Sequence, residues 1–291
     1  MNTKIAFIFG GQGSQVINMG LDLLSLPSIK TLWAEAQKIT GIDFEKSVQD
    51  EDLLSQTKYV QPLILLVQES LRRLININPK AVAGQSLGEY NALIASGVLS
   101  FEEALRLVVK RGQAMAMALE EKTMMKAVLG DLTHLDELLK IKGLYLSNLN
   151  SNQQAVVGGT VDAFDQVSDL PPGIKRLIPL KTEGAFHTPY MLKAVPHFEK
   201  AFDGVALKTP HLDIYQNVSG QKIPTITQES LLDHLIKPVQ FYPIIEAMID
   251  EGIDTFIEIA PASLLAKTIH QINPNVTIHS ITDLTSIHAL H

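Results

Sequence analysis

A serine with a glycine two positions away on each side is the first candidate for chemistry, in Gly84-Gln85-Ser86-Leu87-Gly88. Small apolar residues precede it, as in a buried strand, and residues 87–95 are typical of a helix. A sharp strand-to-helix turn strains its corner residue, and flanking glycines make room for it. The serine Oγ then lies at a helix N-terminus, where free N–H groups can hold an oxyanion. The pattern indicates a nucleophile, or else a serine that only caps the helix in a capping box with Glu89.

A serine nucleophile needs a base, and histidine is the natural candidate in a chain that has nine histidines and no cysteine. His187 stands after a Gly-Ala-Phe turn and before Pro189. A histidine on a rigid loop at a domain junction is well placed to face a cleft. His134 and His234 lie in polar, helix-like stretches and are not favoured. On pattern alone, a purely structural role for His187 stays open.

Arg111 lies in the clearest helical pattern of the chain, residues 99–121. It shares a face with Leu107, Val108 and Met115, so we expect its side chain to point inward. Its neighbours three and four positions away are apolar and cannot pair with its charge. A buried guanidinium must find an anion. We therefore expect either a carboxylate from another segment or the carboxylate of a substrate, held by two hydrogen bonds.

Alternating strands and helices must position these residues. The pattern predicts buried strands at 4–9, 80–86, 255–261 and 276–281, and helices at 18–38, 60–76, 87–95, 99–121 and 263–272. This alternation favours one α/β core with a mainly parallel sheet. The glycine-rich loop 10–15 lacks the lysine and the spacing of a phosphate loop, but its N–H groups could build an oxyanion hole. The last residues, 284–291, are expected to form a loose tail.

The pattern of predicted elements changes to short strands and short helices between residues 126 and 184. Short strand patterns at 126–130, 143–150, 154–159 and 176–182 enclose helical patches at 133–141 and 161–168. The order β-α-β-β-α-β is the ferredoxin-like arrangement. We therefore expect a small inserted α+β domain at 126–184 and a large catalytic domain formed by 1–125 and 185–291.

Composition excludes several classes of function. The chain has 291 residues, 46% of them hydrophobic and 19% charged, so it can bury a substantial core. A net charge of −7 argues against nucleic-acid and anionic-membrane binding. The absence of cysteine excludes a disulfide framework, a cysteine nucleophile and a cysteine-ligated metal. No apolar run has the length of a membrane span or a secretory signal, which predicts a soluble cytoplasmic protein.

Four motifs, which follow one another in order along the chain, resemble those of a known family. They are "FIFGGQGSQ", "AGQSLGEYNALIASGVLSFEEALRLVVKRG", "GAFHTPYM" and "KPVQFYP". Together they resemble the malonyl-CoA:acyl carrier protein transacylases, including the free-standing acyltransferases that serve polyketide synthases. The resemblance extends over nearly the whole chain. It implies an α/β-hydrolase-like core with a ferredoxin-like insert, in agreement with the domains expected above.

The resemblance also assigns the reacting groups. Ser86 matches the nucleophile of the family and His187 matches its base. The backbone N–H groups of Gln12 and Leu87 match the oxyanion hole. Gln240 matches the residue whose backbone carbonyl orients the histidine. The family uses this Ser-His dyad without an acid.

The remaining matches concern the substrate. Arg111 matches the arginine that grips the malonyl carboxylate, with Gln61 and Met115 in the same pocket. Phe186 belongs to a signature typical of malonyl-type acyltransferases and is expected to guard against an α-methyl group. Asn150 fits the pattern of a CoA-binding residue near the cleft.

The resemblance implies a ping-pong acyltransferase that carries malonyl from malonyl-CoA, through a serine ester, to the phosphopantetheine thiol of an acyl carrier protein. It implies no metal and no redox cofactor, and we expect a monomer. A proofreading hydrolase on the same scaffold and a non-catalytic carrier-docking module are the alternatives. A generic esterase would be expected to place a recognisable acid between Ser86 and His187.

Overall fold

Two separate β-sheets organise the chain, and the computed structural model describes residues 3–119 and 122–290 of it. The larger sheet, called the core sheet, has the strand order β10-β9-β1-β2-β7-β8. Its strands are β10 (Thr277–Ile281), β9 (Thr255–Ile259), β1 (Ile5–Phe9), β2 (Ala81–Gly84), β7 (Asp213–Tyr215) and β8 (Lys222–Ile223). Neighbours from β10 to β7 pair in parallel, and β8 is antiparallel to β7. The expected α/β core with a mainly parallel sheet is confirmed.

Alternation along β1 divides the interior into two cores, one on each face of the core sheet. Phe7 and Phe9 belong to the first core, whereas Ala6 and Ile8 belong to the second. The first core includes residues of α1 (Pro27–Thr40), α4 (Thr57–Leu74) and α6 (Phe101–Met117). The second includes residues of α11 (Phe241–Asp250) and α12 (Leu265–Ile272). Because parallel strands need crossover connections, their helices cover both faces.

Shorter helices complete this part of the molecule. They are η1 (Asp22–Ser25), α2 (Phe44–Ser47), α3 (Glu51–Ser55), η2 (Ser86–Gly88), α5 (Glu89–Ala95), η3 (Pro189–Ala194), α9 (Val195–Glu199), η4 (Lys200–Phe202), α10 (Gln228–Ile236) and α13 (Leu284–Ala289). Within residues 3–119 and 122–290, no helix is both long enough and apolar enough to span a bilayer.

Some of the expected elements were wrong in extent. The helix expected over 18–38 begins at Pro27, because the turn η1 precedes it and proline suits the first position of a helix. The expected loose tail contains α13, whose Ile287 is buried in the first core. Burial of that side chain holds the segment against the protein. Residue 291 of the expected tail lies outside the described residues. The helix expected over 99–121 ends at Met117, and its residues 120 and 121 also lie outside the described residues.

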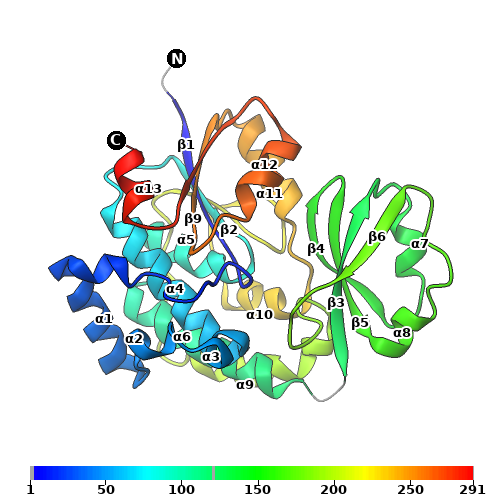
Figure 1. Ribbon diagram of the computed structural model, residues 1–291, viewed down its shortest axis with the longest axis horizontal. Helices are drawn as coiled ribbons and strands as arrows, with labels where there is room; N and C mark the ends of the chain where they lie inside the picture. The colour runs from blue at the N-terminus through cyan, green and yellow to red at the C-terminus, as the bar shows by residue number, and fades with distance from the viewer. Residues whose placement is uncertain (1–2, 120–121, 291) are drawn as a thin grey trace.

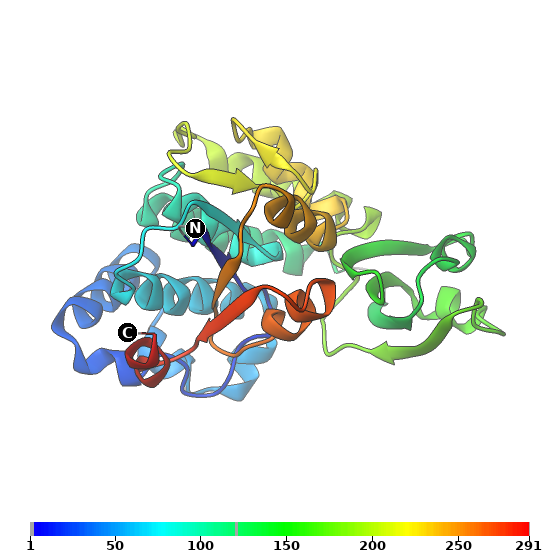
Figure 2. The same cartoon turned by 90° about the horizontal axis from the view of Figure 1, so that it is seen from above.

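The second sheet, called the small sheet, has the predicted order of elements. These are β3 (Thr123–Gly130), α7 (Leu135–Leu139), β4 (Leu144–Ser151), β5 (Gln154–Thr160), α8 (Val161–Asp165) and β6 (Ile174–Pro179). The strands pair antiparallel in the order β4-β5-β3-β6. Figures 1 and 2 show this sheet, with α7 and α8, to one side of the core sheet.

The boundaries of the two predicted domains remain a prediction. The strand that opens the small sheet begins at Thr123, ahead of the expected boundary at 126. Residues 1, 2, 120, 121 and 291 of that division lie outside the described residues. Asn148 on β4 forms a bridge with Val239, which ties the small sheet to the segment before α11.

Parallel pairing brings the two candidate loops together. The register pairs Phe9 of β1 with Gly84 of β2. The loop over 10–15 and the turn over 85–88 therefore leave the same edge of the core sheet. The carboxyl edge of a parallel sheet is where α/β proteins bind their ligands.

Candidate active site

Ser86 stands on a strained turn between β2 and α5. Its φ of 53° lies in the left-handed region, which residues with a side chain seldom adopt. A Cβ on Gly84 would lie 1.9 Å from the carbonyl carbon of Gly88, and one on Gly88 would lie 2.2 Å from the carbonyl oxygen of Phe9. Both glycines are thus required by the close approach of the backbone. The predicted turn is present in the structure.

The Oγ of Ser86 contacts His187 and does not cap the helix. Oγ lies 2.7 Å from Nε2 of His187. The cap position of α5 is Gly88, and no side chain caps it there. The capping alternative was therefore wrong, since the glycine turn directs Oγ toward the histidine. Serine and base are therefore in direct hydrogen-bond contact.

His187 is held by its other ring nitrogen and by a strained backbone. Its φ is 59°, and Nδ1 lies 2.7 Å from the carbonyl oxygen of His234. Since a carbonyl can only accept, Nδ1 carries the proton and Nε2 has a lone pair for the serine proton. The loop before it is anchored to the small sheet, because Ala185 N–H donates to Thr123 Oγ1 at 3.0 Å and Ser147 Oγ donates to the Phe186 carbonyl at 2.8 Å.

The expected orienting residue, Gln240, was wrong. Its carbonyl accepts from Ile244 N–H at 3.2 Å, and its own N–H donates to the carbonyl of Asn217. Gln240 precedes the first residue of α11, so its carbonyl is used by the first turn of that helix. The carbonyl that orients His187 belongs to His234, in the last turn of α10.

Burial keeps His187 in its neutral form. The ring is 3% exposed, and burial lowers the pKa of His187 well below its usual value. The electrostatic effects of the His234 ring and of the Arg111 guanidinium lower this pKa further, while the hydrogen bond to the His234 carbonyl opposes the shift. A neutral imidazole is the form that can accept a proton from serine.

A pocket between the two sheets contains most of the expected site residues. It is lined by residues from the core-sheet loops, from α4 and α6, and from the small sheet. The expected residues among them are Gln12, Gln61, Ser86, Met115, Asn150, Phe186 and His187. Asn150 accepts a hydrogen bond of 2.9 Å from Gln85, the neighbour of the serine, so a bond joins the two sheets across the pocket.

Arg111 is buried beside this pocket and does not line it. It is 1% exposed, and Nη1 donates to Oε1 of Gln61 at 2.7 Å. Its Nε and Nη2 have no hydrogen-bond partner among residues 3–119 and 122–290. The Tyr90 ring lies 5.7 Å from the guanidinium carbon. Burial lowers the pKa of Arg111, while nearby Tyr90 and Glu89 oppose the shift.

The two expected oxyanion donors lie on either side of the serine. A Cβ on Gly11 would lie 2.7 Å from the carbonyl oxygen of Gln85, so the loop carrying Gln12 runs directly against the serine turn. The Gln12 side chain is fixed by a hydrogen bond of 3.2 Å to Thr57 Oγ1. Leu87 follows Ser86 in η2 and is buried. Backbone N–H groups in the first turn of a helix have no acceptor within that helix, so the N–H of Leu87 suits the role of an oxyanion donor.

Sequence reasoning missed a set of residues under the dyad. Asn217 Oδ1 accepts from the N–H of Ser86 at 2.9 Å, and its Nδ2 donates to the Gly84 carbonyl at 2.7 Å and to Glu89 Oε2 at 3.0 Å. A strand signal could have found Asn217, because it follows β7, the parallel neighbour of β2. The same edge of the sheet then brings it beside the serine turn.

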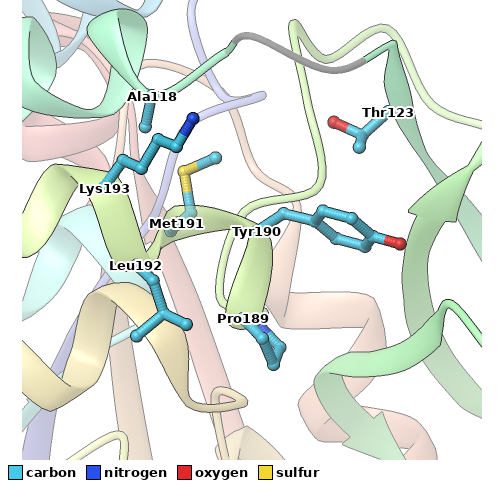
Figure 3. A pocket seen from close by; sticks show the side chains of 7 residues that line it. All are labelled: Ala118, Thr123, Pro189, Tyr190, Met191, Leu192 and Lys193. Carbon is cyan, nitrogen blue, oxygen red and sulfur yellow. The ribbon is translucent and has the colours of Figure 1, made fainter.

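A second pocket lies at the junction of the two sheets and contains no residue of the dyad (Figure 3). Its lining comes from Ala118, Thr123 and the segment 189–193. Tyr190 extends from this segment, and its hydroxyl donates to the carbonyl of Gly143 at 3.2 Å. These contacts fix the loop that carries His187. In the described part of the chain, no three His, Asp or Glu side chains are grouped to hold a metal ion.

A serine activated by histidine at the carboxyl edge of a parallel sheet is the arrangement of enzymes that work through an acyl-serine. Comparison with known proteins agrees with this class. The chain belongs to the acyl transferase domain family, whose profile matches residues 6–286.

Individual relatives cover the whole length. A malonyl CoA-acyl carrier protein transacylase of Bacillus subtilis (strain 168) is 33% identical over 305 aligned residues, which cover 98% of this chain and 95% of the relative. The crystal structure of the transacylase of that name from Clostridium perfringens is similar with a TM-score of 0.93, at 31% identity, over 99% of this chain and 96% of that one. A malonyl-transacylase in complex with a type II PKS acyl-carrier protein is similar with a TM-score of 0.91, at 28% identity, over 99% of this chain and 98% of that one.

Proposed function

We propose that this chain transfers a malonyl group from malonyl-CoA to the phosphopantetheine thiol of an acyl carrier protein, through an ester on Ser86. The observation that carries this proposal is the 2.7 Å contact of Ser86 Oγ with His187 Nε2, beside a buried arginine with two unpartnered donors. The names of the relatives support malonyl-CoA as donor and an acyl carrier protein as acceptor.

The first half-reaction acylates the serine. His187 Nε2 takes the proton of Ser86 as Oγ attacks the thioester carbonyl. The N–H groups of Gln12 and Leu87 stabilise the oxyanion. The carbon–sulfur bond breaks, and the imidazolium returns its proton to the leaving thiolate of CoA.

The second half-reaction runs through the same groups. The phosphopantetheine thiol gives its proton to His187 Nε2 and its sulfur attacks the ester carbonyl. The bond to Oγ breaks, and Ser86 recovers the proton. Because only one base at one position is needed, an acid behind His187 is not required.

The other pocket residues set the choice of acyl group. Arg111 holds the malonyl carboxylate, and Gln61 and Met115 form the wall beside it. Phe186 lines the pocket, and in this proposal its ring excludes an α-methyl group. Asn150 lies where the CoA or phosphopantetheine arm enters. We place the reaction in the cytoplasm, on a monomer, without a metal or redox cofactor.

Intact-mass measurement tests the proposal. Malonyl-CoA should add one malonyl group to the wild type and none to Ser86→Ala. The acyl-enzyme should persist until a carrier protein is added, and the carrier should then gain the mass. If the ester instead empties into water and the carrier never gains mass, the protein is a hydrolase. If no ester forms but the carrier binds, it is a docking module.

A further inference from the structure

A buried pair of ionisable side chains lies directly beneath the dyad. Glu89 on α5 is 0% exposed and His234 on α10 is 1% exposed. Nδ1 of His234 lies 2.7 Å from Oε2 of Glu89. Glu89 Oε1 and both ring nitrogens of His234 make no hydrogen bond among residues 3–119 and 122–290, so the short contact of Nδ1 with Oε2 is a close approach of two ionisable groups and not a hydrogen bond. Burying such a pair is costly, and a buried pair is weak evidence for stability by itself.

Each member of the pair touches one half of the dyad. The His234 ring stacks on that of His187, with centroids 5.0 Å apart and planes inclined by 25°. On the other side, Glu89 Oε2 accepts from Asn217, which in turn accepts from the N–H of Ser86. The contacts therefore form a closed ring from nucleophile to base through groups that do not react.

We propose that His234 and Glu89 are positioning residues of the dyad, whose contact fixes the base on α10 and the serine turn before α5 at reacting distance. This role belongs to the side chain of His234. It is separate from the hydrogen bond that the backbone carbonyl of His234 accepts from His187, since every substitution would keep that carbonyl. This inference rests on the proposed function only in taking Ser86 as nucleophile and His187 as base.

The same geometry predicts a change in the pKa of His187, which a purely structural role of His234 would not produce. The charged and titratable groups facing His187 are His234 on α10, Arg111 on α6 and, beyond them, Glu89 and Tyr90 on α5. Besides burial, the electrostatic effects of the His234 ring and of the Arg111 guanidinium lower the pKa of His187. Removing the His234 ring takes away one of these two electrostatic effects and keeps that of Arg111. The pKa of His187 should rise, and the loss of serine reactivity in acid should begin at higher pH.

The test uses phenylmethanesulfonyl fluoride, which sulfonylates an activated serine with loss of fluoride and requires no acyl-CoA. The labelling rate is followed by intact mass against pH for wild type, His234→Gln, Glu89→Gln and the double variant. We expect each single variant to label about tenfold more slowly or worse, as for a small misplacement of reacting groups. The double variant should lose less than the product of the two single losses, since the partners act as a unit.

A matched control separates positioning from stability. Leu231 lies on α10, as His234 does, and is fully buried in the first core. Leu231→Ala should lower the melting temperature but keep the wild-type position of the acid limb. The inference is overturned if His234→Gln keeps both the rate and the acid limb of the wild type, or if the two single losses simply multiply. Glu89 lies on another helix, so Glu89→Gln is an independent test if His234→Gln does not fold. In that case, a wild-type labelling rate in Glu89→Gln is sufficient to overturn the inference.

The outcome is distinguishable from a failure of the proposed function. If labelling of the wild type is absent, or persists in Ser86→Ala, the dyad itself is wrong and the inference falls with it. If wild type is labelled as expected but transfers no malonyl group, the positioning role stands and the substrate assignment fails.

Discussion

Replacing Arg111 with alanine should invert the acyl preference of the enzyme. One donor of the guanidinium, Nη1, is already used by Gln61. The other two, Nε and Nη2, share one edge of the planar group and have no partner in the described part of the chain. Arg72 uses this same edge to hold Glu69, at 2.7 and 2.8 Å. The free edge of Arg111 therefore suits a carboxylate from the substrate.

The magnitude follows from burial. Arg111 is 1% exposed, so a carboxylate bound to it is desolvated. Truncating one partner of a buried, hydrogen-bonded charge pair costs about 2–5 kcal/mol. At 1.36 kcal/mol per tenfold, this corresponds to a loss of about 30- to 5,000-fold in kcat/KM for malonyl transfer. Acetyl has no carboxylate, so its transfer should hold steady or rise. Arg111→Lys should restore little, because an ammonium lacks the planar fork.

The assay is the ratio of malonyl to acetyl transfer to a carrier protein, with folding followed by thermal melting. Arg106 is the matched control on the same helix, because its side chain is 58% exposed and pairs with Glu102 on the surface. Arg106→Ala should leave the ratio unchanged. If both transfer rates fall together in a well-folded Arg111→Ala protein, the arginine is structural and the reasoning fails.

Two further predictions concern the dyad. Because burial lowers the pKa of His187 well below 6.5, its neutral, active form should persist as the pH falls through 6.5, and acylation of Ser86 should decline only at lower pH. An acid limb at or above 6.5 in the rate of acylation would contradict this. Gly84→Ala should abolish acylation, because its Cβ would lie 1.9 Å from the Gly88 carbonyl carbon. Gly41→Ala is the control for strain without a clash, because its Cβ would meet no atom within 4 Å but its φ of 74° suits glycine. It should lower the melting temperature and keep the wild-type rate by intact mass, and acylation of the Gly84 variant would refute the requirement for a tight turn.

Features with a local cause could be predicted from the sequence. The turn at Ser86 follows from two glycines at fixed spacing, and the capping box of Ser100 with Glu103 is present at the start of α6. The inward direction of Arg111 follows from helical periodicity alone. In each case the residues that specify the feature are within a few positions of one another.

Features that depend on contacts between distant segments could not be predicted from the sequence. His234 lies 47 positions from His187 and was placed in a polar stretch, yet it is buried and stacked on that ring. The expected role of Gln240 failed for a related reason. The motif around it is visible in the sequence, but the place where α10 ends and α11 begins decides which carbonyl is available.

The strained backbone at both ends of the dyad has a common physical basis. Ser86 and His187 have φ values of 53° and 59°, and such conformations cost about 1–3 kcal/mol each. Local sequence does not stabilise them, since neither residue is glycine. Hydrogen bonds to distant parts of the chain stabilise these conformations, from the Ser86 N–H to Asn217 and from His187 Nδ1 to the His234 carbonyl. The reacting geometry is thus maintained by the surrounding fold. Loss of those contacts should relax the dyad before it unfolds the protein.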